Sequence, residues 1–248
     1  MKYFLDLAYN GKNYCGWQNQ PNALSVQEVV EKTLSTLLRQ EISVVGAGRT
    51  DAGVHAKQLY AHFEVVPIEH LEEFQYRLNA FLPADIAVNA IRPVLENAHA
   101  RFDATQREYE YHVTTTKDPF LVDVAYQVNH MPDLEIMNLA ASELLNYKDF
   151  QCFSRSKTDV KTYHCDIERA NWEQRGDLLV FTIAADRFLR NMVRAIVGTL
   201  LDIGYKKTSL EEFRNIIDSK NRQNAGASAP AHGLFLTKVK YPKTTFID

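Results

Sequence analysis

Apolar and polar residues alternate along several stretches of the chain, which is the pattern of a strand with one buried face. The first stretch carries Tyr3, Leu5, Leu7 and Tyr9 on one face and stops at the turn-forming pair Asn10-Gly11. Similar alternation or short apolar runs predict further strands near residues 42–45, 59–65, 86–92, 109–113, 162–172, 178–184 and 234–241.

Apolar residues at helical spacing fill the segments between these strands. Ser25 and Glu28 form a capping-box pattern ahead of one such segment, and Ser209 and Glu212 form a second. Asp133 is a candidate N-cap for a third segment. Helices are predicted over residues 26–38, 69–80, 134–146 and 187–203 and from residue 209 onward.

Strands and helices are mixed in both halves of the chain, and antiparallel alternation outweighs any strand–helix–strand rhythm. These features predict an α+β fold with an antiparallel sheet as its spine. The best boundary lies near Ala104, which divides the chain into residues 1–104 and 105–248. No linker-like composition marks this boundary, so we expect the two halves to share one sheet.

Composition narrows the possible functions. The chain is 46% hydrophobic and 24% charged, and it contains no apolar run long enough to cross a membrane. Cys15, Cys152 and Cys165 are scattered and odd in number, which argues against a disulfide framework or zinc site and favours a reducing cytoplasm. The formal net charge is −3, so an RNA-binding function would require cations gathered on one face.

One run of small residues holds a carboxylate close to a guanidinium: Gly46-Ala47-Gly48-Arg49-Thr50-Asp51-Ala52-Gly53-Val54-His55. Glycines at 46, 48 and 53 let the backbone take positive φ and let a ligand approach it closely. In an extended stretch, Arg49 and Asp51 would project to the same side. A structural turn and a phosphate cradle are alternatives, but the third glycine of a dinucleotide loop and a Gly-Lys-Ser/Thr sequence are both missing. The Arg-x-Asp pair favours a functional site.

Tyr109 and Tyr111 share one face of a predicted strand. Alternating aromatic residues mostly fill a core, and core packing is the favoured interpretation of the pattern by itself. A stacking platform for an unpaired base is the functional alternative.

Arginines also recur on the predicted helix over residues 187–203. Arg187, Arg190 and Arg194 would lie on one face, which usually means a solvated cationic stripe. Arg194 lies at the edge of the apolar arc, where a guanidinium needs a carboxylate partner, and Asp51 is a candidate. The histidines show no metal-ligand spacing, and only His55 is kept open as a functional residue because it follows the glycine-rich run.

Taken together, these stretches resemble the tRNA pseudouridine synthase A family. The whole run from Gly46 to His55 matches the signature loop of that family. Arg107-x-Tyr109-x-Tyr111 resembles its tyrosine motif, Phe188 to Arg194 its arginine helix, and Ala229 to Leu234 its closing segment. The segment from Tyr14 to Gln18 resembles the family's Gly-Trp-Gln segment, so the resemblance runs from the first strand to the last.

The resemblance implies that Asp51 is the catalytic carboxylate, which attacks the target nucleotide at uracil C6 or at ribose C1′. The bond to N1 breaks, the base rotates and a carbon–carbon bond forms at C5, with no redox change and therefore no cofactor or metal. A target inside a stem would first flip out of its stack. Arg49 would hold the flipped state, Arg194 would pair with Asp51, and Tyr109 would stack on the base.

The resemblance further implies a tRNA partner bound at its anticodon stem-loop, a fold of two ferredoxin-like halves with merged sheets, and a homodimer. By position, Arg101 and Phe102 in one segment and Arg155 in another resemble residues that contact tRNA. For each of these arginines taken alone, an ordinary surface charge is nearly as good an interpretation as a contact to tRNA. Glu108 and Glu110 place acids around Tyr109 and fit tRNA binding less well.

Two other function classes remain open. The first is a catalytically silent RNA-binding or RNA-folding module on the same fold. The second is an unrelated phosphate-binding enzyme whose glycine loop cradles a nucleotide.

Overall fold

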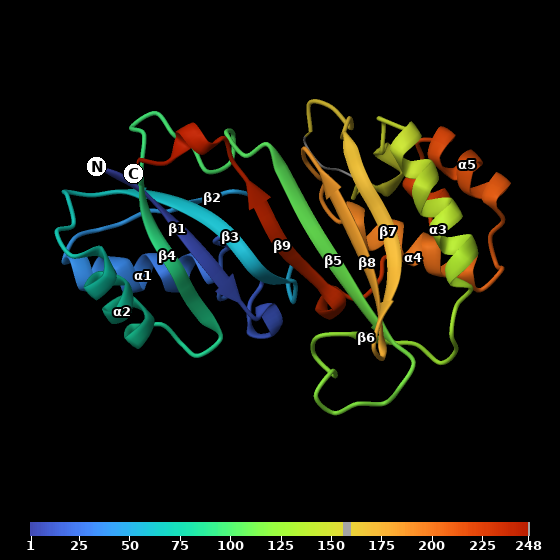
Figure 1. The fold of residues 1–248 in the computed structure, drawn as a ribbon, viewed down its shortest axis with the longest axis horizontal. Helices are drawn as coiled ribbons and strands as arrows, with labels where there is room; N and C mark the ends of the chain where they lie inside the picture. Colours follow the sequence, from blue (N-terminus) through green and yellow to red (C-terminus); the bar gives the residue numbers. More distant parts are fainter. Residues whose placement is uncertain (156–159, 248) are drawn as a thin grey trace. The chain divides into compact units, whose positions relative to one another are not determined.

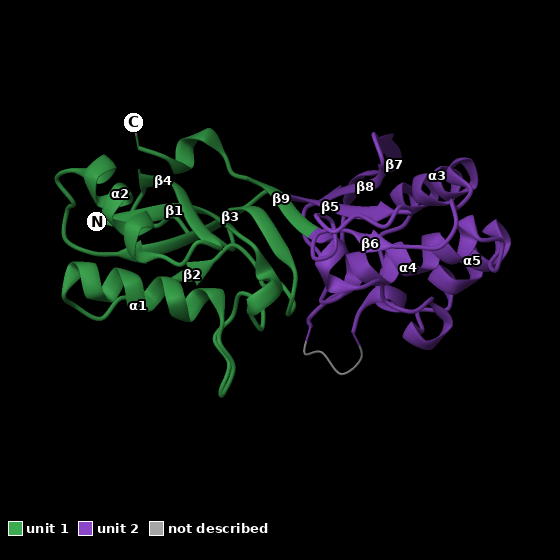
Figure 2. Ribbon diagram, turned by 90° about the horizontal axis from the view of Figure 1, so that it is seen from below, with its two compact units in different colours: residues 1–106, 235–248 green, residues 107–234 purple. Residues whose placement is uncertain are grey.

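The computed structural model describes residues 1–155 and 160–247, which form mixed α/β structure with mostly antiparallel strands. The chain divides into two compact units, coloured in Figure 2. Residues 1–106 and 235–248 make up unit 1, and residues 107–234 make up unit 2. The predicted boundary follows Ala104, whereas the units divide after Gln106 and the last fourteen residues (235–248) return to unit 1.

Unit 1 is built on strands in the order β4-β1-β3-β9 (Figure 1). The strand β1 pairs antiparallel with both β3 and β4. The strand β9 pairs parallel with the start of β3, and β2 pairs antiparallel with β3 nearer its end. Two helices complete the unit, and α2 packs on β4 and contacts α1. The bounds are β1 Lys2–Tyr9, α1 Val26–Leu38, β2 Val45–Gly46, β3 His55–Glu64, α2 Leu71–Phe81, β4 Ile86–Val94 and β9 Leu234–Lys240.

The strand β1 is buried along one face and partly buried along the other. Tyr3, Leu5, Leu7 and Tyr9 are all buried, as the alternation predicts. On the opposite face Phe4 is buried and the other residues are half-buried. Aromatic residues of the C-terminal segment cover Phe4: Tyr241 lies 5.2 Å and Phe246 6.0 Å from its ring. The C-terminal segment therefore covers this face of β1 at Phe4.

Unit 2 contains the antiparallel strands β5, β8 and β7, with the short β6 parallel to β5. Its helices lie together beside these strands (Figure 1), where α3 packs on β7 and on α4, and α4 contacts α5. The bounds are β5 Gln106–Thr114, β6 Tyr126–Gln127, α3 Leu134–Glu143, β7 Ile167–Arg175, β8 Leu178–Ala185, α4 Met192–Gly204 and α5 Leu210–Asp218.

The predicted helix starts at Ser25, Asp133 and Ser209 are confirmed by side-chain caps. The Ser25 hydroxyl accepts from the Glu28 N–H, and the Asp133 carboxylate accepts from the Ile136 N–H. At Ser209 the full capping box is present, since the Glu212 carboxylate also accepts from the Ser209 N–H. Such caps satisfy amide donors that the first helical turn leaves unpaired.

The predicted helix over residues 187–203 is wrong at its start, because α4 begins only at Met192. Asn191 has a φ of 66°, a left-handed conformation that cannot continue a right-handed helix. Of the three arginines predicted to share a helical face, only Arg194 is on the helix. The cationic stripe is therefore absent.

Candidate functional site

The glycine-rich loop joins β2 to β3 in unit 1 and is fastened to the segment from residue 11 to residue 17. The Trp17 N–H donates to the Thr50 carbonyl at 3.3 Å, and the Gly53 N–H donates to the Tyr14 carbonyl at 3.3 Å. These two bonds lie on either side of Asp51. The carboxylate is thus carried by a loop held at both ends.

Asp51 also begins a tight turn. Its carbonyl accepts from the Val54 N–H at 3.1 Å. Gly53 occupies the third position of this turn with a φ of 78°, where a type II turn requires a residue that tolerates positive φ. Gly53 thus uses the positive φ that glycine permits.

Gly46 and Gly48 do not adopt the positive φ that glycine permits. Gly46 is needed for packing instead, because a Cβ there would lie 2.4 Å from the indole Nε1 of the buried Trp17. At Gly48 no described atom lies within 4 Å of where a Cβ would be, apart from its chain neighbours. Packing within the described residues therefore gives no reason for a glycine at position 48.

We expect alanine to destabilise the protein at Gly46 and to have little effect on stability at Gly48. Gly46→Ala should lower the free energy of unfolding by about 1–3 kcal/mol, since the indole has to move out of a packed core. Gly48→Ala should change it by no more than about 0.5 kcal/mol. Urea unfolding of both variants measures the difference, and equal values would contradict the packing described for Trp17.

Burial along the loop alternates as expected for an extended segment. Arg49 is exposed, Thr50 is buried and Asp51 is half-buried. The buried Thr50 hydroxyl lies 2.9 Å from the hydroxyl of Tyr9, at the end of β1. With Thr50 turned inward, its two neighbours lie on the outward side of the loop.

His55 is a structural residue of unit 1. It is 1% exposed, its Nδ1 accepts from the Gly11 N–H at 3.0 Å, and its ring stacks on Phe235 at 4.6 Å. An Nδ1 that accepts a backbone hydrogen bond is unprotonated. The ring fastens the start of β3 to the segment before α1.

The two tyrosines of β5 differ in burial although they share a face. Tyr111 is fully buried, donates its hydroxyl to the Pro230 carbonyl at 2.8 Å, and has its pKa raised by that burial. Gly233 makes room for it, since a Cβ there would lie 2.7 Å from the Tyr111 ring. Tyr109 is only half-buried and meets Phe188 edge-to-face at 5.1 Å. Core packing thus explains Tyr111 in full and Tyr109 in part.

The acids beside Tyr109 have basic partners within unit 2. Glu110 accepts from the Arg175 guanidinium at 2.6 Å and lies 3.2 Å from His112. Glu108 lies 3.9 Å from Arg169. Alternation along β5 turns both acids to the face opposite Tyr109. Their negative charge is therefore compensated locally.

Arg194 lies in the first turn of α4 and is hydrogen-bonded to the segment before β9. Its Nε donates to the Ala229 carbonyl at 2.7 Å, and its own carbonyl accepts from the Ala229 N–H at 2.9 Å. A Cβ at Gly198 would lie 1.7 Å from the Ala227 carbonyl oxygen, so this segment runs directly against the helix. The half-buried guanidinium is consequently fixed in orientation by one of its edges.

Arg101 and Phe102 lie in a turn of unit 1 that two histidines support. The His99 Nδ1 accepts from the N–H groups of both residues, at 3.1 and 3.3 Å. The Phe102 ring is 74% exposed, with His99 4.3 Å away on one side and the Arg101 guanidinium 5.8 Å away. The turn thus presents a cation and an aromatic ring together.

The second histidine, His62, makes this turn sensitive to acid. It is 8% exposed, and its Nδ1 accepts from the Ala100 N–H. Burial and the nearby His99 and Lys2 lower the pKa of His62 to about 4, against the opposing effect of Glu64 and Asp103. Because the folded pKa is depressed, the unfolded chain binds more protons between pH 6.5 and 4, and stability falls as the pH falls through that window.

We therefore expect the free energy of unfolding to lose on the order of 3 kcal/mol through His62 between pH 7 and pH 4. Urea unfolding of the wild type and of His62→Gln at several pH values isolates the contribution of His62 to the pH dependence of the free energy of unfolding. The variant should show the shallower pH dependence. Identical slopes would contradict the assignment.

Arg155 is an exposed residue of unit 2, next to residues 156–159, which lie outside the described structure. Its N–H donates to the Arg190 carbonyl at 3.0 Å, so the backbones of these two arginines lie side by side. The predicted site residues thus divide between the units: Arg49, Asp51, Arg101 and Phe102 belong to unit 1, and Tyr109, Arg155 and Arg194 to unit 2.

The residues that hold the loop in place are not marked by a local sequence pattern. The alternation places Tyr9 on a strand face, and Trp17 belongs to the segment that resembles the family's Gly-Trp-Gln segment. Asp85 accepts from the Tyr14 hydroxyl at 2.6 Å and from the Asn13 side chain at 3.0 Å, which steadies the segment that supports the loop. Each of these contacts joins residues far apart in the chain, so a local sequence pattern cannot predict them.

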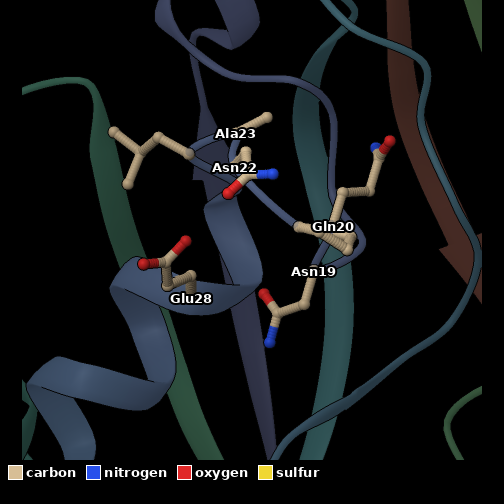
Figure 3. Close-up of a pocket in the computed structure, with 7 residues that line it drawn as sticks. Asn19, Gln20, Asn22, Ala23 and Glu28 are labelled. Carbon is tan, nitrogen blue, oxygen red and sulfur yellow. The ribbon is translucent and has the colours of Figure 1, made fainter.

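A hollow of about 610 Å³ lies elsewhere in unit 1. Figure 3 shows it bounded by the turn that carries Asn19, Gln20 and Asn22 and by Glu28 on α1. Its lining residues include none of the predicted site residues, so we do not assign it to the chemistry of the glycine-rich loop.

Within residues 1–155 and 160–247, no three His, Cys, Asp or Glu side chains group in a way that could hold a metal ion. In the same ranges, no helix has the length and apolarity needed to span a membrane.

Comparison with known proteins gives similarity over nearly the whole chain. A family model described as tRNA pseudouridine synthase matches residues 7–103 and 140–242. A protein named tRNA pseudouridine synthase A from Parabacteroides distasonis is 53% identical over 246 residues, covering 99% of this chain and 98% of its own. A protein of the same name from Bacteroides fragilis is 51% identical and covers 99% of this chain and 98% of its own. Another, from Francisella tularensis subsp. holarctica, is 38% identical and covers 98% of this chain and 95% of its own.

Proposed function

Because the chain belongs to the tRNA pseudouridine synthase family, we propose that it isomerises uridine to pseudouridine in tRNA, with Asp51 as its catalytic carboxylate. The observation that carries the role of Asp51 is its position: a half-buried acid in a loop that is hydrogen-bonded on both sides of it. A carboxylate held in this way can meet a reacting atom without first paying for its own ordering.

The proposed reaction rearranges bonds within one nucleotide. The Asp51 carboxylate attacks uracil C6 or ribose C1′, and the bond between N1 and C1′ breaks. The base rotates, C5 forms a bond to C1′, the proton on C5 leaves to solvent, and N1 takes up a proton from solvent. In either version the bond to Asp51 breaks again, so the carboxylate is regenerated and electrons balance without a cofactor.

The other site residues are assigned supporting roles. Arg194 pairs with Asp51 and keeps it ionised, a role that its fixed guanidinium suits. Arg49, exposed on the outward side of the loop, holds the target nucleotide in its flipped state. Tyr109 stacks on the base, a role that its half-buried ring suits better than the fully buried ring of Tyr111.

The open position of Gly48 also supports a substrate at this loop. Glycine allows another backbone to come close, and here the room beside it is taken by no described atom beyond the chain neighbours. A nucleotide drawn toward Asp51 would use that room. The phosphate-cradle alternative would use it too, and the experiment below separates the two.

For tRNA recognition we propose contacts at Arg101, Phe102 and Arg155. The exposed arginines suit phosphates, and the exposed Phe102 ring suits an unstacked base or sugar. We further propose the anticodon stem-loop as the target region, two ferredoxin-like halves as the fold, a homodimer as the assembly and the cytoplasm as the compartment. These four rest on the family resemblance.

Tritium release from tRNA labelled at uracil C5 tests the proposal, because only loss of the C5 proton liberates the label. We expect release with tRNA and no saturable binding of free uridine monophosphate. Bound tRNA without any release would favour the silent RNA-binding module. Saturable binding of the mononucleotide would favour the phosphate-binding enzyme.

A further inference from the structure

Tyr9 connects the end of β1 to the residue directly before Asp51. It is 4% exposed, and its hydroxyl lies 2.9 Å from the equally buried hydroxyl of Thr50. The Tyr9 ring stacks against Trp17, with centroids 6.3 Å apart and planes at 28°. Because this packing holds the ring independently of Thr50, the tyrosine hydroxyl is a fixed point to which the loop is attached.

The loop around Asp51 is held by backbone contacts and by one buried side chain. The Thr50 carbonyl accepts from the Trp17 N–H, and the Asp51 carbonyl accepts from the Val54 N–H. The backbone of Gly16 also runs close to this peptide, since a Cβ at Gly16 would lie 2.2 Å from the Thr50 carbonyl oxygen. The bond from the Thr50 hydroxyl to Tyr9 adds a side-chain anchor on the inner side of the loop, opposite the outward Asp51 side chain.

From this arrangement we infer that Tyr9 is a positioning residue for Asp51, acting through the Thr50 hydroxyl. The inference rests on the proposed function and adds to it a residue that does not touch the substrate. Displacing a reacting group by about 1 Å can cost about 100-fold in rate. Loss of the Tyr9 hydroxyl therefore slows the chemical step while leaving tRNA binding, made by other residues, unchanged.

Tyr3 provides a matched control on the same strand. It is 1% exposed on the same face of β1, and its hydroxyl accepts from the Ile68 N–H at 2.9 Å, far from the glycine-rich loop in the chain. Tyr9→Phe and Tyr3→Phe each remove a buried hydroxyl together with the hydrogen bond described for it. Their urea midpoints should shift by similar amounts, so a difference in activity between them does not come from stability.

We expect Tyr9→Phe to lower kcat for tritium release by about 10- to 100-fold, with the Kd for tRNA within about twofold of wild type. Tyr3→Phe should retain kcat within about twofold. Thr50→Val should lower kcat as much as Tyr9→Phe does, and the double variant should be no slower than either single variant. Thr50→Ser keeps the hydroxyl and should therefore retain most of the wild-type kcat. Equal kcat values for Tyr9→Phe and Tyr3→Phe would overturn the inference.

Hydrogen exchange separates this inference from the proposed function. The Val54 amide, which closes the Asp51 turn, should exchange faster in Tyr9→Phe than in wild type and remain unchanged in Tyr3→Phe. If the wild type releases no tritium but this exchange pattern appears, the proposed function fails and the positioning contact stands. If exchange is unchanged in Tyr9→Phe, the positioning role fails whether or not the wild type is active.

Discussion

We expect Asp51→Asn to lose pseudouridine formation by about 10⁴-fold or more, the order of loss seen when a catalytic nucleophile is removed. Asparagine has nearly the same shape and can make similar backbone contacts, but its neutral amide is a far weaker nucleophile. The loop is hydrogen-bonded through the backbone of its neighbours and through Thr50, so the fold should survive the change. Tritium release measures the loss, and filter binding should show unchanged affinity for tRNA.

Asp177→Asn is the control for this prediction. Asp177 is an exposed acid in the turn between β7 and β8, and its replacement removes the same charge without touching the loop. It should keep wild-type turnover. An Asp51→Asn variant with rates close to those of Asp177→Asn would remove Asp51 from the mechanism.

The second large effect is expected at Arg194. In Arg194→Lys the positive charge remains, but the ammonium cannot both bond to the Ala229 carbonyl and present a planar edge to a carboxylate. We expect kcat to fall by about 10²-fold, the order seen when one fixed charge-stabilising donor is lost from an active site. The Kd for tRNA should change far less than kcat.

Arg214→Lys makes a suitable comparison, since Arg214 is also on a helix and paired with an acid, Glu143, at 2.7 Å. That pair is exposed, and exposed pairs contribute little. Its replacement should leave activity and stability near wild type. If Arg194→Lys behaves in the same way, Arg194 has no part in orienting Asp51.

The strand pattern and the helix caps could be predicted from sequence because they depend on neighbouring residues. Alternation along residues 3–9 gives β1, and Ser209 with Glu212 gives a complete capping box. The start of α4 could not be predicted in this way. Residues 187–190 have ordinary helical composition, but their structure depends on distant contacts such as the Arg155 N–H to the Arg190 carbonyl and the Asn191 side chain to Ser228.

The same limit explains the residues of the site. Tyr109 and Tyr111 are equivalent in a period-of-two pattern, and only the close approach of Pro230 and Gly233 makes Tyr111 a core residue. Likewise, Gly46 looks like a flexible loop glycine until Trp17 is seen packed on it. The set of Arg49, Asp51, Tyr109 and Arg194 was recognised by resemblance to a family, since residue spacing alone left functional and structural interpretations close together.

Nucleoside analysis of tRNA after incubation with the wild type and with Asp51→Ala tests the central claim most directly, because it measures the product itself. The account predicts pseudouridine in tRNA treated with the wild type and none with the variant, with both proteins bound to tRNA. Pseudouridine formed by Asp51→Ala at the wild-type rate would contradict the role of Asp51. The absence of pseudouridine from tRNA that the wild type binds would contradict the proposed function.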